Sequence, residues 1–154
     1  MWSPSNTVRA GLTLVDMVIS VLIVGIMAAV AVPRSIDTLH RYRANAAAER
    51  VLVDLELARK DAMSASAART VRFSSTSYTL SAMSDLDRSR AVYAVDLAEP
   101  PYRSAVAAAA LAGDKIIIFD GYGRPDSGGR VVIVSGGRQA TVSVDAETGR
   151  ASIP

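Results

Sequence analysis

Few side chains in this sequence are suited to catalysis or to metal binding. His40 is the only histidine among the 154 residues, and there is no cysteine. No acidic cluster or nucleophile lies near His40 in the sequence, so a catalytic set cannot be assembled around it. The lack of thiols excludes a disulfide framework, a thiol nucleophile and a thiolate metal site. We therefore expect a protein that is not an enzyme and that needs no cofactor.

Three aspartates and two glycine-containing segments are the next candidates, for metal and for phosphate. Asp114, Asp120 and Asp126 are evenly spaced, whereas calcium loops place their oxygen ligands at closely alternating positions. The glycines at 121–123 and 128–129 lack the complete dinucleotide-binding fingerprint, and no convincing helix start follows them. We expect these aspartates and glycines to form turns, and the sequence predicts no metal site.

Four arginines near the C-terminus are the remaining candidates for binding an anion: Arg124, Arg130, Arg138 and Arg150. They would form a contact surface for DNA or another partner if their strand faces align. The alternative is that they are scattered, solvated side chains. A formal charge of +2, from 17 basic and 15 acidic residues, does not by itself indicate nucleic-acid binding.

An apolar segment near the N-terminus is the most informative element. Residues 12–32 carry a single charged side chain and would measure about 31 Å as a helix, so we expect a transmembrane helix there. A secretory signal peptide would be shorter, whereas this run continues into a charged helical pattern. Arg9 is consistent with a cytosolic leader, but the arginines after the segment leave an orientation based on charge ambiguous: Arg34, Arg41 and Arg43.

The one charge in this segment is Asp16, which lies five residues into the apolar run. An unpaired carboxylate there costs about 2.5 to 3.5 kcal/mol on insertion scales. Asp16 is therefore expected either to have a cationic partner or to lie close enough to the headgroups to stay hydrated.

The sequence around Asp16, Gly11-Leu12-Thr13-Leu14-Val15-Asp16, resembles the cleavage motif of type IV pilin-like proteins. That motif is usually written Gly-Phe-Thr-Leu-Val-Glu and precedes a hydrophobic helix; Leu12 replaces its usual Phe and Asp16 its usual Glu. In that family a membrane-embedded prepilin peptidase cuts after the glycine and methylates the new N-terminus. The resemblance implies a leader at 1–11, cleavage between Gly11 and Leu12, and N-methylation of Leu12.

The resemblance also implies roles for Asp16 and Pro33. Asp16 would neutralise the α-amine of a neighbouring helix inside the membrane and so set the register between subunits, as the family is thought to do when it builds a filament with apolar helices at its centre. Pro33 falls where many pilins carry a helix-kinking proline, and it is expected to kink or interrupt the helix because it lacks a backbone donor.

Residues 33–68 continue the helical period and predict an amphipathic helix that enters the globular domain. Its apolar face, expected to lie on a sheet, consists of Ala44, Ala48, Val51, Leu55, Ala58 and Ala62. Its charged residues are expected on the solvated side: Glu49, Arg50, Asp54, Glu56, Arg59, Lys60 and Asp61.

Residues 69–154 predict a β-rich domain, because the pattern changes towards a period of two. The expected strands are 70–74, 77–82, 91–97, 115–119, 130–135, 138–144 and 150–153. Gly136 and Gly137 predict a two-residue hairpin turn, since glycine accepts positive φ. Residues 85–90 are expected to form a polar loop, and the alanine-rich segment 103–112 a short helix or an inserted loop.

The expected fold is α+β, with a long N-terminal helix, first transmembrane and then amphipathic, packed on a small antiparallel β-sheet domain. This order of elements is similar to the minor pseudopilins of the H type (GspH) and their FimT-like relatives. The resemblance implies a non-enzymatic subunit of a type II secretion pseudopilus. A minor type IV pilin in pilus assembly or DNA uptake is the first alternative, and a single-pass anchored binding domain is the second.

The same resemblance implies a location and partners. The chain would be a single-pass protein of the bacterial inner membrane, with its globular domain in the periplasm or outside. Its partners would be prepilin peptidase, other pilin-like subunits, the inner-membrane assembly platform, membrane lipid and secreted cargo, with DNA a partner only in the alternative function.

Overall fold

The computed structural model describes residues 13–84, 92–111 and 113–154, without the side chains of residues 30–35 and 82–84. The chain divides into two compact units, Met1–Ile36 and Asp37–Pro154, and each is considered by itself. The predicted leader 1–11, the cleavage residues Gly11 and Leu12, and the predicted loop 85–90 lie outside the described residues.

Helix α1 runs from Leu14 to Ala65 and covers most of the two predicted helical segments. The helical assignment passes through Pro33 without a break, so the helix is not interrupted there, and a bend at Pro33 stays a prediction. The helix ends where Ser66 adopts a positive φ of 49°. Within the described residues, no helix combines the length and the apolar content that crossing a membrane requires.

In the first unit, α1 presents an apolar surface on all sides. Every large apolar side chain between Leu14 and Met27 is exposed, from 48% for Ile19 to 79% for Leu14. A helix that is apolar all round is stable only where lipid or other apolar surfaces cover it.

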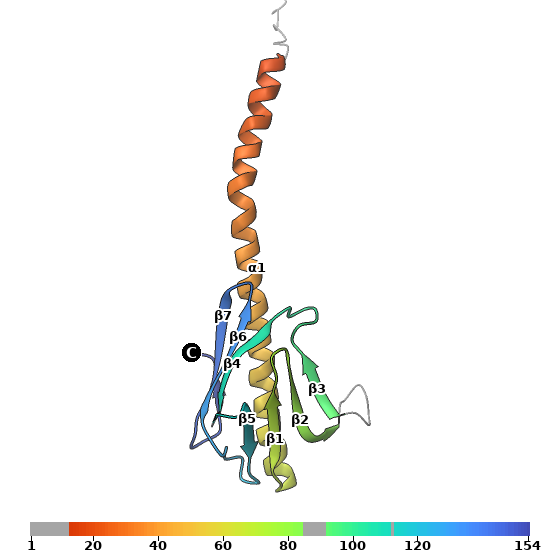
Figure 1. Ribbon diagram of the computed structural model, residues 1–154, viewed down its shortest axis with the longest axis vertical. Helices are drawn as coiled ribbons and strands as arrows, with labels where there is room; N and C mark the ends of the chain where they lie inside the picture. The colour runs from red at the N-terminus through yellow and green to blue at the C-terminus, as the bar shows by residue number, and fades with distance from the viewer. Residues whose placement is uncertain (1–12, 85–91, 112) are drawn as a thin grey trace, which may run out of the picture. The chain divides into compact units, whose positions relative to one another are not determined.

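The strands of the second unit form two antiparallel sheets, which Figure 1 shows beside the helix. The first sheet has the order β3-β2-β1-β5 and consists of β1 (Arg69–Phe73), β2 (Ser77–Ser84), β3 (Val92–Asp96) and β5 (Ile116–Phe119). The second has the order β4-β6-β7-β8 and consists of β4 (Ala105–Leu111), β6 (Gly129–Ser135), β7 (Arg138–Val144) and β8 (Ala151–Ser152). The α+β fold is confirmed, and the predicted strands agree with the observed ones to within two residues at each end.

The prediction for the alanine-rich segment 103–112 was wrong, because its central part forms strand β4. Alanine favours helix in isolation, but here Val106 and Leu111 are buried while β4 pairs with β6. The small side chains also suit a close approach, since a Cβ on Gly129 of β6 would lie 2.0 Å from the carbonyl oxygen of Ala110. Packing against β6 therefore overrides the local preference.

The predicted apolar face of the amphipathic segment is confirmed as the centre of the core. All six predicted residues are at most 1% exposed, and Ala47 joins them. They pack in one cluster with Val71, Leu80 and Ile117 of the first sheet and with Val131, Ile133 and Val142 of the second. The mostly alanine surface of α1 thus lies against both sheets.

Asp54 corrects the prediction of a wholly solvated charged face, because it is only 2% exposed. Its Oδ1 accepts a hydrogen bond from the hydroxyl of Tyr93 at 2.9 Å, and its Oδ2 accepts one from the hydroxyl of Tyr78 and one from Arg50 Nε at 3.1 Å. Burial and the neighbouring carboxylate raise the pKa of Tyr78 and of Tyr93 above the usual phenol value, so both hydroxyls remain donors at neutral pH. A buried carboxylate with these donors ties the helix to β2 and β3.

We expect Asp54→Ala to lower the free energy of unfolding by about 3 kcal/mol, because it leaves buried hydroxyl groups without their acceptor. The measurement is chemical unfolding of the purified full chain in detergent micelles, followed by far-ultraviolet circular dichroism.

Glu49→Ala is the matched control, since Glu49 lies exposed on the same helix and its replacement should change stability by less than about 0.5 kcal/mol. Equal effects of the two substitutions would contradict a stabilising role for the Asp54 contacts.

Candidate functional site

The first candidate site is Asp16, in the first turn of α1. Its Oδ2 accepts hydrogen bonds from the backbone N–H of Thr13 at 3.2 Å and from the Thr13 hydroxyl at 2.8 Å. The Thr13 hydroxyl oxygen in turn accepts the backbone N–H of Asp16 at 3.3 Å. These reciprocal bonds form a capping box, in which two orphan amide groups of the helix start are satisfied.

This capping role was missed in the sequence, although its signal is present. A threonine followed three residues later by an acidic residue, before an apolar run, marks a helix start. Both side-chain contacts of Asp16 use the Oδ2 atom. Among the described residues, Oδ1 accepts no hydrogen bond, so a second role for the carboxylate is compatible with the cap.

The second candidate site lies at the β6–β7 turn. Gly136 and Gly137 have φ values of 51° and 82°, which confirms the predicted hairpin. A Cβ on Gly136 would lie 2.3 Å from Nδ1 of His40, so the turn sits directly on the helix at that residue. His40 Nδ1 is 3.4 Å from the hydroxyl of Ser135, which donates to the carbonyl of Arg103. The only histidine therefore packs under the hairpin.

A bidentate ion pair holds the same turn to the start of the second unit. Arg138 donates from Nε to Oδ1 of Asp37 at 2.6 Å and from Nη2 to Oδ2. The hydrogen bond from Arg138 holds the pKa of the Asp37 carboxyl below its usual range. The guanidinium plane of Arg138 is thereby fixed next to the hairpin turn.

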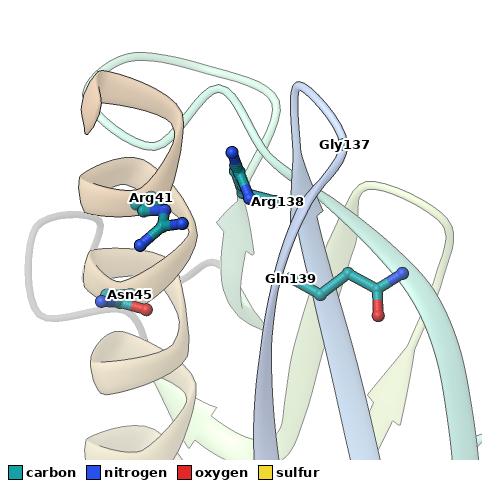
Figure 2. A pocket seen from close by; sticks show the side chains of 5 residues that line it. All are labelled: Arg41, Asn45, Gly137, Arg138 and Gln139. Atoms are coloured by element: carbon teal, nitrogen blue, oxygen red, sulfur yellow. The ribbon is translucent and has the colours of Figure 1, made fainter. Parts of the chain in front are cut away.

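Beside this ion pair is an open polar pocket of about 470 Å³, shown in Figure 2 and lined by Arg41, Asn45, Gly137, Arg138 and Gln139. Arg41 and Asn45 come from α1, and the other three residues come from the hairpin. No carboxylate of the described residues lies within ion-pair distance of Arg41. The pocket therefore presents two guanidinium groups and the Asn45 amide, with one carboxylate paired at its edge, whereas the Gln139 side chain points away from the helix (Figure 2).

The four predicted arginines do not form one surface. The hairpin register places Arg138 beside the turn and Arg130 near the opposite end of the strands, across from Ser143. Arg150 follows Gly149, whose added Cβ would lie 2.5 Å from the carbonyl of Gly123, so Arg124 and Arg150 belong to that opposite end as well. Arg124, Arg130 and Arg150 are exposed, whereas Arg138 is paired with Asp37.

The predicted turn role is confirmed for Asp114 and Asp120. Asp114 lies in the turn before β5, and Asp120 Oδ1 accepts the backbone N–H groups of Tyr122 and Arg124. Asp126 Oδ1 instead accepts the backbone N–H of Ile118 in β5. In the described part of the chain, no three histidine or acidic side chains are placed to hold a metal ion.

For the Asp37–Arg138 pair we expect Arg138→Gln to increase amide hydrogen exchange at residues 135–139, since the turn loses its ion pair with α1.

Because the pKa of Asp37 is lowered in the folded protein, the pair stabilises the protein at pH values above 3.8, the ordinary pKa of this carboxyl. This stabilisation is lost as the pH falls further. The stability difference between wild type and Asp37→Asn should therefore be present at neutral pH and shrink below that value. A difference that grows on acidification would contradict the assignment.

Comparison with known proteins places this fold in a family. A crystal structure of the type IV minor pilin FimU from Pseudomonas aeruginosa matches with a TM-score of 0.53 and 16% sequence identity, over 74% of this chain and 90% of that chain. At this identity the likeness shows a common fold only. Comparison with curated protein sequences gives no significant match. The profile of the type II transport protein GspH family matches residues 47–149, and the chain therefore belongs to the GspH family.

Proposed function

We propose that the chain is a minor pseudopilin of a type II secretion system, a structural subunit that assembles through its N-terminal helix. The observation that carries this proposal is the family match over residues 47–149, which covers the last part of α1 and all strands except β8. A pilin-like fold, with a helix that belongs partly to the first unit and partly to the globular second unit, fits a filament subunit.

The first unit supplies the assembly surface in this proposal. Its apolar side chains between Leu14 and Met27 are exposed in the chain by itself. Contact of so large an apolar surface with water is unfavourable, so another apolar surface is expected to cover it. Segment 12–32 would anchor the chain once in the inner membrane, with residues 37–154 in the periplasm or outside. Membrane lipid would cover it before assembly, and the helices of other pilin-like subunits afterwards.

Asp16 would have two tasks in the processed chain. Cleavage by prepilin peptidase after Gly11 would leave an N-methylated Leu12 close to the capping box of Thr13 and Asp16. Oδ2 would keep capping the helix, while Oδ1 would accept the α-ammonium group of a neighbouring subunit. Such pairing neutralises both charges in an apolar setting and would fix the axial register between subunits.

A minor type IV pilin is the second candidate function, because the matching structure is that of a type IV minor pilin. The two functions share the same fold and the same assembly helix, and they differ in the partners of the chain. A DNA-uptake role within this alternative would use the end of the second unit that carries Arg124, Arg130 and Arg150, since Arg138 lies at the other end of the β6–β7 hairpin.

We expect mass spectrometry of a C-terminally tagged chain, extracted from native membranes, to find an N-terminal peptide that begins with methylated Leu12. The proposed peptidase removes residues 1–11 and modifies the new amine. Secretion pseudopilins should co-purify with the tagged chain.

Pilus or competence proteins in place of secretion pseudopilins would favour the second candidate. An intact Met1, or cleavage after the apolar segment, would refute both and leave an anchored or exported β domain.

We expect Asp16→Asn to reduce co-purification of pilin-like subunits by about tenfold or more, because an uncompensated ammonium group is left in the apolar interface. The measurement is quantitative mass spectrometry of the same pull-down, normalised to the tagged chain.

Asp16→Glu is the matched control, since it keeps the carboxylate, and it should retain the partners. N-terminal processing of all three proteins is read from the same spectra, so that a loss of partners is not mistaken for a loss of cleavage. Full retention of partners by Asp16→Asn would remove the register role from Asp16.

A further inference from the structure

We propose that the pocket beside the β6–β7 turn binds the headgroup phosphate of an anionic phospholipid. This inference rests on the proposed function in one respect, namely that residues 12–32 are inserted in the membrane. It assigns a ligand to five residues that come together only in the folded second unit: Arg41, Asn45, Gly137, Arg138 and Gln139.

The pocket has the donors that a phosphate group requires. Asp37 holds Arg138 in place by accepting hydrogen bonds from its Nε and Nη2 atoms. The other N–H groups of the Arg138 guanidinium remain as donors for a ligand. Arg41 adds a second guanidinium from α1, and Figure 2 shows both side chains at the space between the helix and the hairpin. With Asp37 counted, the set carries one net positive charge.

The backbone and the Asn45 amide leave room for the rest of a headgroup. A Cβ on Gly137 would meet no atom within 4 Å, so the hairpin turn does not close the pocket. Asn45 is exposed and offers an amide donor and acceptor that suit glycerol hydroxyl groups. The pocket is open, with a volume of about 470 Å³, so a phosphodiester fits in it as well as a bare phosphate group does.

The position in the chain favours lipid as the source of the phosphate. Asp37 follows the end of the apolar segment by only five residues in the sequence, so the pocket is built from the part of the chain that comes next after the proposed membrane segment. Leu39 is 45% exposed and Tyr42 is 70% exposed on either side of Arg41. An exposed tyrosine beside an arginine is typical of the membrane–water interface.

The test is native mass spectrometry of the purified full chain in detergent, titrated with phosphatidylglycerol or with phosphatidylcholine. We expect the wild type to retain one phosphatidylglycerol in preference to phosphatidylcholine. Arg41→Gln and Asn45→Asp should each need about fivefold more phosphatidylglycerol for the same retention, because each lowers the net charge of the pocket by one unit.

Arg72→Gln is the matched control, since Arg72 is exposed on β1 and its loss changes the net charge equally. Retention should be unchanged in this variant. Equal weakening by Arg72→Gln, or no preference for phosphatidylglycerol, would overturn the proposal, because the attraction would then follow net charge or be absent.

Two other occupants give distinct results in the same spectra. Displacement of the lipid by millimolar inorganic phosphate would identify free phosphate as the ligand and overturn the lipid assignment. A dimer of the chain that is lost in Arg41→Gln, without lipid retention, would identify a second copy instead. Lipid retention and N-terminal processing are measured separately, so a processed chain that retains no lipid refutes this inference alone.

Discussion

The small side chains along one face of α1 are the constraint on which the packing of residues 37–154 depends. The two sheets share no strand among the described residues, and the helix is the element whose buried side chains join both of them in one core. Alanine at positions such as Ala44 and Ala58, both fully buried, keeps the strands close to the helix axis, and a larger side chain there would overfill that space. The same close approach encloses Asp54, which explains why its carboxylate meets two tyrosine hydroxyls rather than water.

Polar contacts at the edges of this face determine where each sheet lies on the helix. Asp61 pairs with Arg69 at the start of β1, and Glu56 accepts the backbone N–H of Ala151 in β8. The Asp37–Arg138 pair likewise holds the β6–β7 turn against α1. These contacts are individually modest, but they fix orientation, which apolar burial alone does not. The pocket beside Arg138 follows from this arrangement, since it exists only where the hairpin turn is held against the first turns of the second unit's helix.

The two units of the chain differ in how they satisfy their apolar side chains. The second unit buries its own core, whereas the first leaves its apolar side chains exposed and depends on surroundings that the chain itself does not supply. The match to the GspH family, over residues 47–149, lies wholly within the second unit. In the proposed function, one carboxylate, Asp16, serves both a helix cap and the contact between subunits, so local structure and assembly depend on the same group.

The sequence by itself determined the apolar segment, the helical period up to the end of α1, the six inward-facing residues and the Gly136-Gly137 hairpin, because each depends on neighbours within a few residues. It also carried the signal for the capping box at Thr13 and Asp16. The tertiary structure alone decided that the alanine-rich segment is strand β4, that Asp54 is buried, and that Arg138 pairs with Asp37. These three outcomes depend on groups distant in sequence: the backbone of β6, the hydroxyls of Tyr78 and Tyr93, and the carboxylate of Asp37. Local propensity cannot encode such partners, since burial and pairing are properties of the packed core.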